Sequence, residues 1–278
     1  RFVAQPLPGG SLQMAVDLQD AAFNLRDLGI RKAAGTSGTL SATITPAGEI
    51  TQLNDIDLSF GTVRAIGDIT YHASQGLQAA SFSQFGLSNG DNAQLDMAPI
   101  EGGYAVQIRG SQLDLKPMLR QFFGLGEGAG GVQSTQFDQT IALDVQLERA
   151  LGFYATTAFN LDLDLLLRGS DMRRANLTAQ FSDGNSLSVT TNPAPRGRTL
   201  SVAFNDAGTI LRLLGVYSQL AGGSGNLVMT TDRDRDVEMG QVVMRDFAIV
   251  DEANVTQVLG NHSDARARIA EQNRLDFD

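Results

Sequence analysis

Asp162 and Asp164 are the two residues whose type and spacing come closest to catalytic chemistry. Alternate positions of a strand point to the same face, so the two carboxylates could divide acid and base roles between them. The sequence offers them no partner: His72 and His262 are the only histidines, and neither has a nearby carboxylate or metal-ligand spacing. We therefore predict that the two aspartates belong to a solvated strand face.

Two other segments match the residue order of binding motifs but lack other features that those motifs require. Residues 126–131 (GEGAGG) fit the dinucleotide pattern, which needs a strand before it and a helix after it, but here they follow a predicted helix. Residues 232–236 (DRDRD) resemble the start of a calcium loop, but Val237 replaces the required Gly and Val243 the bidentate Glu. We interpret them as a linker and a solvated hairpin. The sequence therefore predicts no enzyme, no metal site and no cofactor.

The composition excludes several classes of function. The 278 residues carry a formal charge of −10 and a pI near 4.6, whereas nucleic-acid binding needs a basic surface. Cysteine is absent, so disulfide and thiol chemistry are not available. No stretch approaches the roughly 18 apolar residues of a membrane-spanning helix. Because the chain begins with Arg1 rather than Met, we expect a segment of a longer or processed protein.

The element that would position the two aspartates is an alternating pattern over residues 153–167. Its odd positions are apolar or Thr and its even positions are mostly polar. A period of two predicts one strand with an apolar face and a wet face. At about 3.3 Å per residue this strand would reach roughly 50 Å. Strands in globular proteins are usually about 5–6 residues long, so this one would be far longer than usual. Such a long apolar face needs a cover, either a protein core or a ligand.

The same alternation, separated by turn residues, recurs through residues 11–18, 39–45, 56–60 and 63–71. It predicts a mainly β fold: one elongated, bent antiparallel sheet with a few short amphipathic helices.

Two stretches repeat one plan of three strands followed by a helix. The helices are predicted to begin at Asp114 and Asp206, because each Asp precedes a helical apolar stripe. We interpret the plan as a diverged duplication, with one elongated region built from sub-repeats of about 1–124 and 136–278. The Gly-rich residues 124–135 between them are predicted to be a flexible linker.

Several segments resemble the AsmA-like proteins of Gram-negative bacteria, particularly the YhdP-type branch. They are residues 17–22 (DLQDAA), 28–35 (LGIRKAAG), 108–119 (IRGSQLDLKPML), 206–223 and 244–251 (MRDFAIVD). Residues 261–273 depart from the family pattern. The resemblance implies a periplasmic segment of a long protein anchored in the inner membrane, with a folded-over β-sheet that carries phospholipid towards the outer membrane along a hydrophobic groove.

Two functions stay open at this point. In the first, the chain binds or conducts phospholipid acyl chains along an apolar β-groove and does no covalent chemistry. In the second, it is a structural or assembly module of the cell envelope with a closed core and protein partners. The residues that would line the groove are Phe153, Phe159, Leu161, Leu163, Leu165, Leu167, Ile141, Leu143, Val145, Leu147, Ile56, Leu58 and Phe60.

Overall fold

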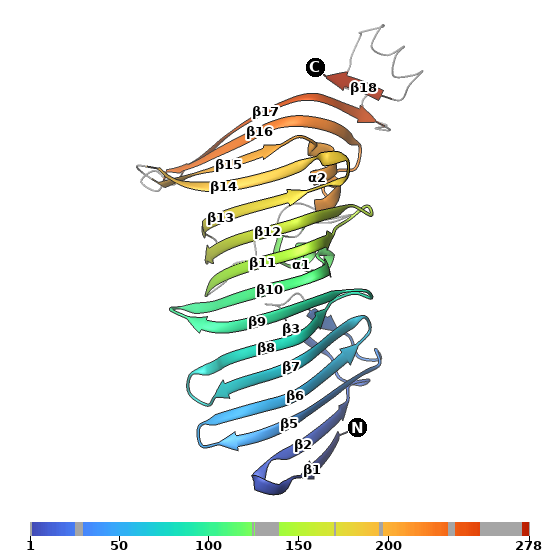
Figure 1. The fold of residues 1–278 in the computed structure, drawn as a ribbon, viewed down its shortest axis with the longest axis vertical. Coiled ribbons are helices and arrows are strands. Elements are labelled where there is room, and N and C mark those ends of the chain that lie inside the picture. Colours follow the sequence, from blue (N-terminus) through green and yellow to red (C-terminus); the bar gives the residue numbers. More distant parts are fainter. Residues whose placement is uncertain are drawn as a thin grey trace.

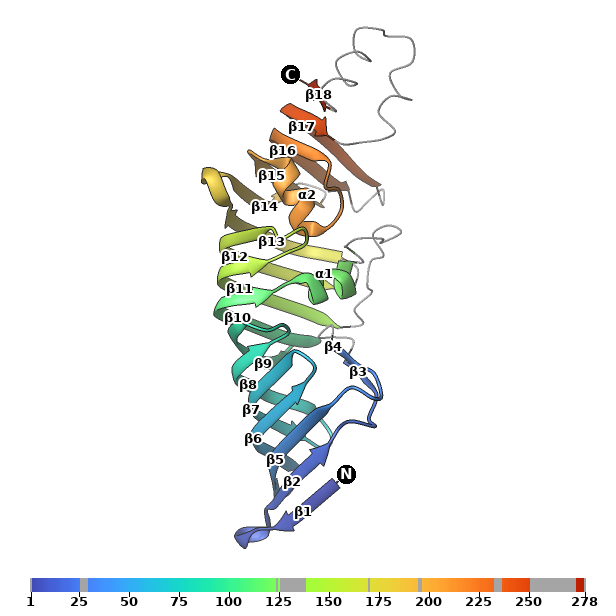
Figure 2. The same ribbon diagram turned by 90° about the vertical axis from the view of Figure 1, so that its right-hand side faces the viewer.

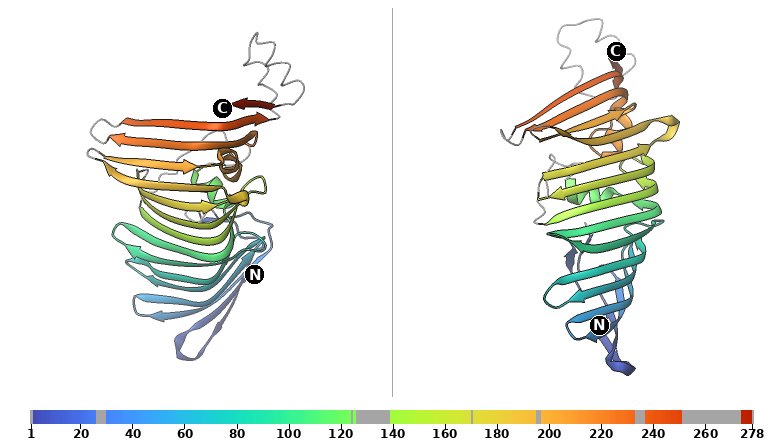
Figure 3. Two further views of the ribbon diagram at one scale, coloured as in Figure 1. Left: turned by 45° about the horizontal axis from the view of Figure 1, so that its top comes forward. Right: turned by 60° about the vertical axis from the view of Figure 1, so that its left-hand side comes forward.

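Sixteen strands form one continuous, curved sheet (Figures 1 and 3). The computed structural model describes residues 2–25, 30–123, 125, 139–169, 171–194, 197–232, 237–250 and 274–277. The described residues are mostly β-strand with few short helices, as the alternating pattern predicted.

The strands follow one another across the sheet in chain order, interrupted only by a small separate hairpin of β3 and β4. Their bounds are β1 (Phe2–Pro6), β2 (Leu12–Asp17), β3 (Phe23–Leu25), β4 (Ile30–Lys32), β5 (Gly38–Ala47), β6 (Ile50–Phe60), β7 (Val63–His72), β8 (Gly76–Gly86), β9 (Asn92–Ile100), β10 (Gly103–Asp114), β11 (Thr140–Leu151), β12 (Thr157–Arg168), β13 (Asp171–Gln180), β14 (Ser186–Ala194), β15 (Gly197–Phe204), β16 (Leu220–Asp232), β17 (Val237–Val250) and β18 (Arg274–Phe277). The α-helices are α1 (Lys116–Phe123) and α2 (Ala207–Leu214), and 3-10 turns lie at Pro8–Gly10 and Ser182–Gly184.

Adjacent strands are antiparallel throughout the sheet with one exception. β10 and β11 pair in parallel, from Gly103 opposite Thr140 to Asp114 opposite Leu151. A parallel neighbour requires the chain to cross back to the end where the first strand began, and the connection that contains α1 does this. The antiparallel prediction is therefore confirmed for the sheet as a whole and wrong for this pair.

Both predicted units of three strands and a helix are present, as β8–β10 with α1 and as β13–β15 with α2. Asp206 caps α2, with its Oδ1 accepting a hydrogen bond of 2.9 Å from the Thr209 N–H. Asp114 ends β10, and its Oδ1 accepts from the Lys116 N–H at 3.0 Å. The helices, together with the β3–β4 hairpin, pack against one face of the sheet, here called the inner face (Figure 2).

Several predicted features fall outside the described residues. They are the linker at 124–135 apart from residue 125, the centre of the calcium-like hairpin at 233–236, and the helices expected after residue 250.

One bulge changes which side chains share a face of β12. Asn160 has a φ of +49°, and the register between β12 and β13 shifts between Phe159 and Asp162. A bulge inserts one extra residue, so the alternation is reset there. Ala158 and Leu161 are both buried, whereas Phe159 is 36% exposed and points to the other side, the outer face. The prediction that Phe159 lies on the same face as Leu161 is wrong.

Asp91 ties the β8–β9 loop to the start of α1. Its carboxylate accepts backbone hydrogen bonds of 2.8–2.9 Å from Leu87, Ser88 and Asp114. Burial nevertheless raises the pKa of Asp91 above its ordinary value of 3.8, because desolvation outweighs these bonds and the charge of Asp114 adds to it. The folded state therefore binds this proton more tightly than the unfolded state.

This difference predicts how replacing Asp91 by Asn alters the pH dependence of stability. A raised pKa contributes stability that is complete below pH 3.8 and is lost as the pH rises through the folded-state value. The free energy of unfolding of the wild type relative to Asp91→Asn should therefore fall as the pH rises through this range. The amide group also leaves one backbone N–H without an acceptor, at a cost of about 1–3 kcal/mol. Denaturant titrations of both proteins across this range measure the difference, and a rise with pH would contradict the prediction.

Candidate functional site

The predicted groove residues of β11 and β12 lie side by side on the inner face. The register pairs Ile141 with Leu167, Leu143 with Leu165, Val145 with Leu163, and Leu147 with Leu161. Each pair brings two branched apolar side chains together on one face. The two strands thus form one apolar strip, as the alternation predicted.

The predicted groove residues of β6 reach the same face. Ile56 and Phe60 are buried, and Leu58 is partly buried against the main apolar cluster, which also contains Phe60. Phe23 of the small hairpin packs edge-on against Phe60, with ring centroids 5.2 Å apart. Inner-face residues of β7 to β10 fill the space between β6 and β11, namely Ala65, Phe85, Ala93, Leu95, Val106 and Ile108.

Phe153 has a different position from the one predicted. β12 begins at Thr157, and residues 153–156 form a turn in which Tyr154 and Ala155 have positive φ, so the prediction of one strand over 153–167 is wrong. The Phe153 N–H donates to the Leu213 carbonyl of α2 at 3.0 Å, and the Arg120 guanidinium of α1 lies 4.9 Å from the ring centroid. Phe153 therefore lies between the two helices.

The apolar cluster is closed at the helix end of the strip. Leu113, Ala150 and Ala158 are fully buried there. Helix residues Met118 and Ile210 pack against the cluster, and Leu213 of α2 is one of its buried members. The alternating pattern did not single out Ala150 and Ala158, because a bulge is needed to turn them inward.

Away from the helices the same face is less covered. Leu143 and Leu163 pack against the cluster but stay partly exposed. Ile141 and Leu167, at the end of the strip, are also partly exposed. Leu165 and Val145, between them, are buried. The inner face therefore changes along β11 and β12 from closed core to a mixture of buried and partly exposed apolar residues.

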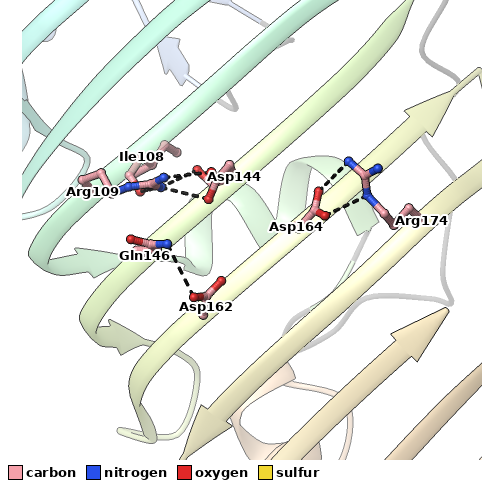
Figure 4. Close-up of polar contacts among 7 residues, drawn as sticks. All are labelled: Ile108, Arg109, Asp144, Gln146, Asp162, Asp164 and Arg174. Carbon is pink, nitrogen blue, oxygen red and sulfur yellow. Dashed lines mark hydrogen bonds and ion pairs between the residues drawn. The ribbon is translucent and has the colours of Figure 1, made fainter.

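The outer face of the same strands is polar and is held by ion pairs (Figure 4). Arg109 binds Asp144 through two bonds of 2.8 and 3.0 Å, and this bond raises the pKa of Arg109. Arg174 likewise makes two contacts with Asp164, of 2.7 and 2.9 Å. Asp162 accepts a long bond of 3.5 Å from Gln146. The two aspartates that the sequence singled out are thus parts of a solvated polar face.

A depression of about 640 Å³ lies over this region, and its lining also includes Leu147 and Leu161. Its polar lining comes from Asn92, Gln94, Arg109, Gln146, Glu148, Asn160 and Asp162, around Gly110. Within the described ranges, no three His, Cys, Asp or Glu residues are placed to hold a metal ion. Among those same residues, no helix is long and apolar enough to cross a membrane.

No family model matches this chain. Searches of curated proteins and of solved structures also return no significant match. The resemblance to AsmA-like proteins therefore stays a prediction.

Proposed function

We propose that this protein binds phospholipid acyl chains on the half-exposed inner face of its sheet and conducts them along it, with no covalent chemistry. In this proposal it is a periplasmic segment of an AsmA-like protein anchored in the inner membrane, and the lipid moves between the inner and outer membranes. The observation that carries the proposal is the partial cover of a continuous apolar face.

Ordinary domains bury the apolar face of a sheet under a second layer. Here the described second layer consists of two helices of eight residues each and a short hairpin. It closes one end of the strip and leaves Leu143 and Leu163 half-exposed. Partly exposed apolar side chains that adjoin one another on an acidic chain are compatible with a binding site.

The less covered end of the strip has a length close to the reach of an acyl chain. Leu163 and Leu167 are partly exposed and lie four residues apart, which corresponds to about 13 Å along a strand. One leaflet of a bilayer has a hydrocarbon depth of about 15 Å, half of the roughly 30 Å core. An acyl chain could therefore lie along β11 and β12 without entering the closed end.

A closed structural module is the competing function, and the buried helix end of the strip favours it locally. The two functions differ in what Leu163 contacts, because a closed module has no lipid on that face. Asp162, which precedes Leu163, lies on the outer polar face (Figure 4) and is a matched control.

A photo-crosslinking residue at position 163 is expected to capture phospholipid in bacterial cells, while one at position 162 should capture little. The physical reason is that alternate residues of β12 face the apolar strip and the polar surface. Mass spectrometry of the purified adducts measures the capture. Equal capture at both positions, or none at position 163, would reject the lipid-binding proposal in favour of the structural module.

A further inference from the structure

A group of arginines surrounds one carboxylate at the start of β13. Asp171 contacts the side chains of both Arg173 and Arg198, and its Oδ2 lies 2.9 Å from Arg173 Nε. Arg168 of β12 is the cross-strand neighbour of Asp171. Three arginines thus lie near a single aspartate in a protein with a net charge of −10. No local pattern in the sequence marks this group.

The two guanidinium groups that share Asp171 are not fully satisfied. Arg198 Nη1 is buried and makes no hydrogen bond, and Arg173 Nε is buried and not aligned for a hydrogen bond despite its short distance to Asp171. The side chain of Arg198 is only 12% exposed. Buried donors are nearly always paired, so the unpaired Nη1 of Arg198 indicates a missing acceptor.

Arginines elsewhere on these strands show the satisfied arrangement. Arg109 and Arg174 each have a carboxylate of their own, bound through two contacts. Among the described side chains, Arg173 and Arg198 instead share one carboxylate, so these three groups carry one net positive charge. No second carboxylate among the described residues forms an ion pair with either of them. An anion with several acceptor oxygens would satisfy both the charge and the free donors.

The sheet is also incomplete at this point. β13 pairs with β14 only from Leu177 to Gln180, so residues 171–176 lack a regular neighbour on that side. Thr191 bridges the separation, with its hydroxyl bonded to both backbone groups of Ala175. Arg198 of β15 reaches Asp171 across the same region, so the site is made by side chains rather than by the sheet ladder.

The position of this group relative to the apolar strip suggests which anion it binds. Leu167, the last apolar residue of the strip, immediately precedes Arg168, and Leu167 and Arg168 are the cross-strand partners of Met172 and Asp171. The arginine group therefore lies at the less covered end of these strands, with Arg168 and Asp171 on the face opposite Leu167 and Met172. This order of charge and apolar surface matches a molecule with a phosphate at one end and hydrocarbon at the other.

We propose that Arg173 and Arg198 bind a phosphate group, and that it is the headgroup phosphate of the phospholipid whose acyl chains lie along β11 and β12. This inference rests on the proposed function for the source of the phosphate but not for the anion site itself. Planar guanidinium groups suit phosphate oxygens, and two of them would hold the headgroup at the end of the strip.

The test uses the whole chain and three probes: a soluble short-chain phosphatidylglycerol, a diacylglycerol with the same chains, and inorganic phosphate. Arg198→Gln and Arg173→Gln are compared with the matched control Arg174→Gln, which alters the neighbouring arginine that Asp164 already satisfies. Losing a charge-assisted hydrogen bond should weaken phosphatidylglycerol binding about tenfold in the first two variants and little in the control. Circular dichroism verifies folding, and Arg173→Gln serves if Arg198→Gln does not fold.

The outcomes separate the two proposals. If the short-chain lipid binds but all three variants bind it equally, or diacylglycerol binds as tightly, the anion site is rejected and the acyl-chain proposal stands. If inorganic phosphate binds and Arg198→Gln weakens it while neither lipid binds, the anion site stands and the proposed function fails. If no probe binds the wild type, both are rejected.

Discussion

Replacing Leu161 by Asp is expected to cost several kcal/mol of folding stability, enough to unfold the protein or part of its sheet. Leu161 is 7% exposed and belongs to the central apolar cluster between Val145, Leu147 and Ala179. An unpaired carboxylate there either stays protonated or opens the cluster to water, and both are costly. Chemical denaturation followed by circular dichroism measures the loss.

Phe159→Asp is the matched control, two residues away on the same strand. The bulge at Asn160 puts Phe159 on the outer face opposite Arg149, so a carboxylate at position 159 stays in water. Its cost should be within about 1 kcal/mol. Uninterrupted alternation would instead give the two substitutions similar effects, and that result would show that the bulge is absent in solution.

Replacing Gly103 by Ala is expected to disrupt the junction of β10 and β11. A Cβ at position 103 would lie 1.7 Å from the carbonyl oxygen of Thr140 and 2.7 Å from its nitrogen. These are backbone atoms of the first residue pair in the parallel ladder, and the Thr140 N–H bonds to the Gly102 carbonyl at 2.8 Å beside them. Because neither strand can yield by rotating a side chain, we expect a loss of about 1–3 kcal/mol or more.

Gly240→Ala provides the comparison for this second substitution. Gly240 is also a strand glycine, but the nearest atom to an added Cβ is Met229 Cγ at 3.6 Å, an ordinary contact. We expect a change within about 0.5 kcal/mol. Thermal unfolding of both variants compares them, and equal stabilities would show that β10 and β11 are not closely paired at Gly103.

Much of the sheet could be predicted from local patterns. Apolar and polar residues alternate along a strand whatever its neighbours are, so the β class, most strand positions and the polar setting of Asp162 and Asp164 were visible in the sequence. The Asp206 cap was visible for the same reason, since a cap acts within one turn of its helix. The apolar strip of β11 and β12 follows from the same alternation on both strands.

The candidate site was predicted less completely, because its edges depend on pairing between distant segments. In the sequence, Asn160 is compatible both with the polar face of a regular strand and with a bulge. The shift in register between β12 and β13 shows that it is a bulge, which turns Phe159 outward. Phe153 fits the alternation, yet its contacts with α1 and α2 place it in a turn.

The sequence by itself therefore determined which residues prefer water and which avoid it, and with that the strands and their two faces. Only the tertiary structure decided the parallel β10–β11 pair, the closed and half-exposed ends of the strip, and the meeting of Arg173 and Arg198 at Asp171. The physical reason is that side-chain periodicity is a property of one strand. Register, cover and charge clustering arise between strands, and Arg198 lies 27 residues from Asp171 in the chain.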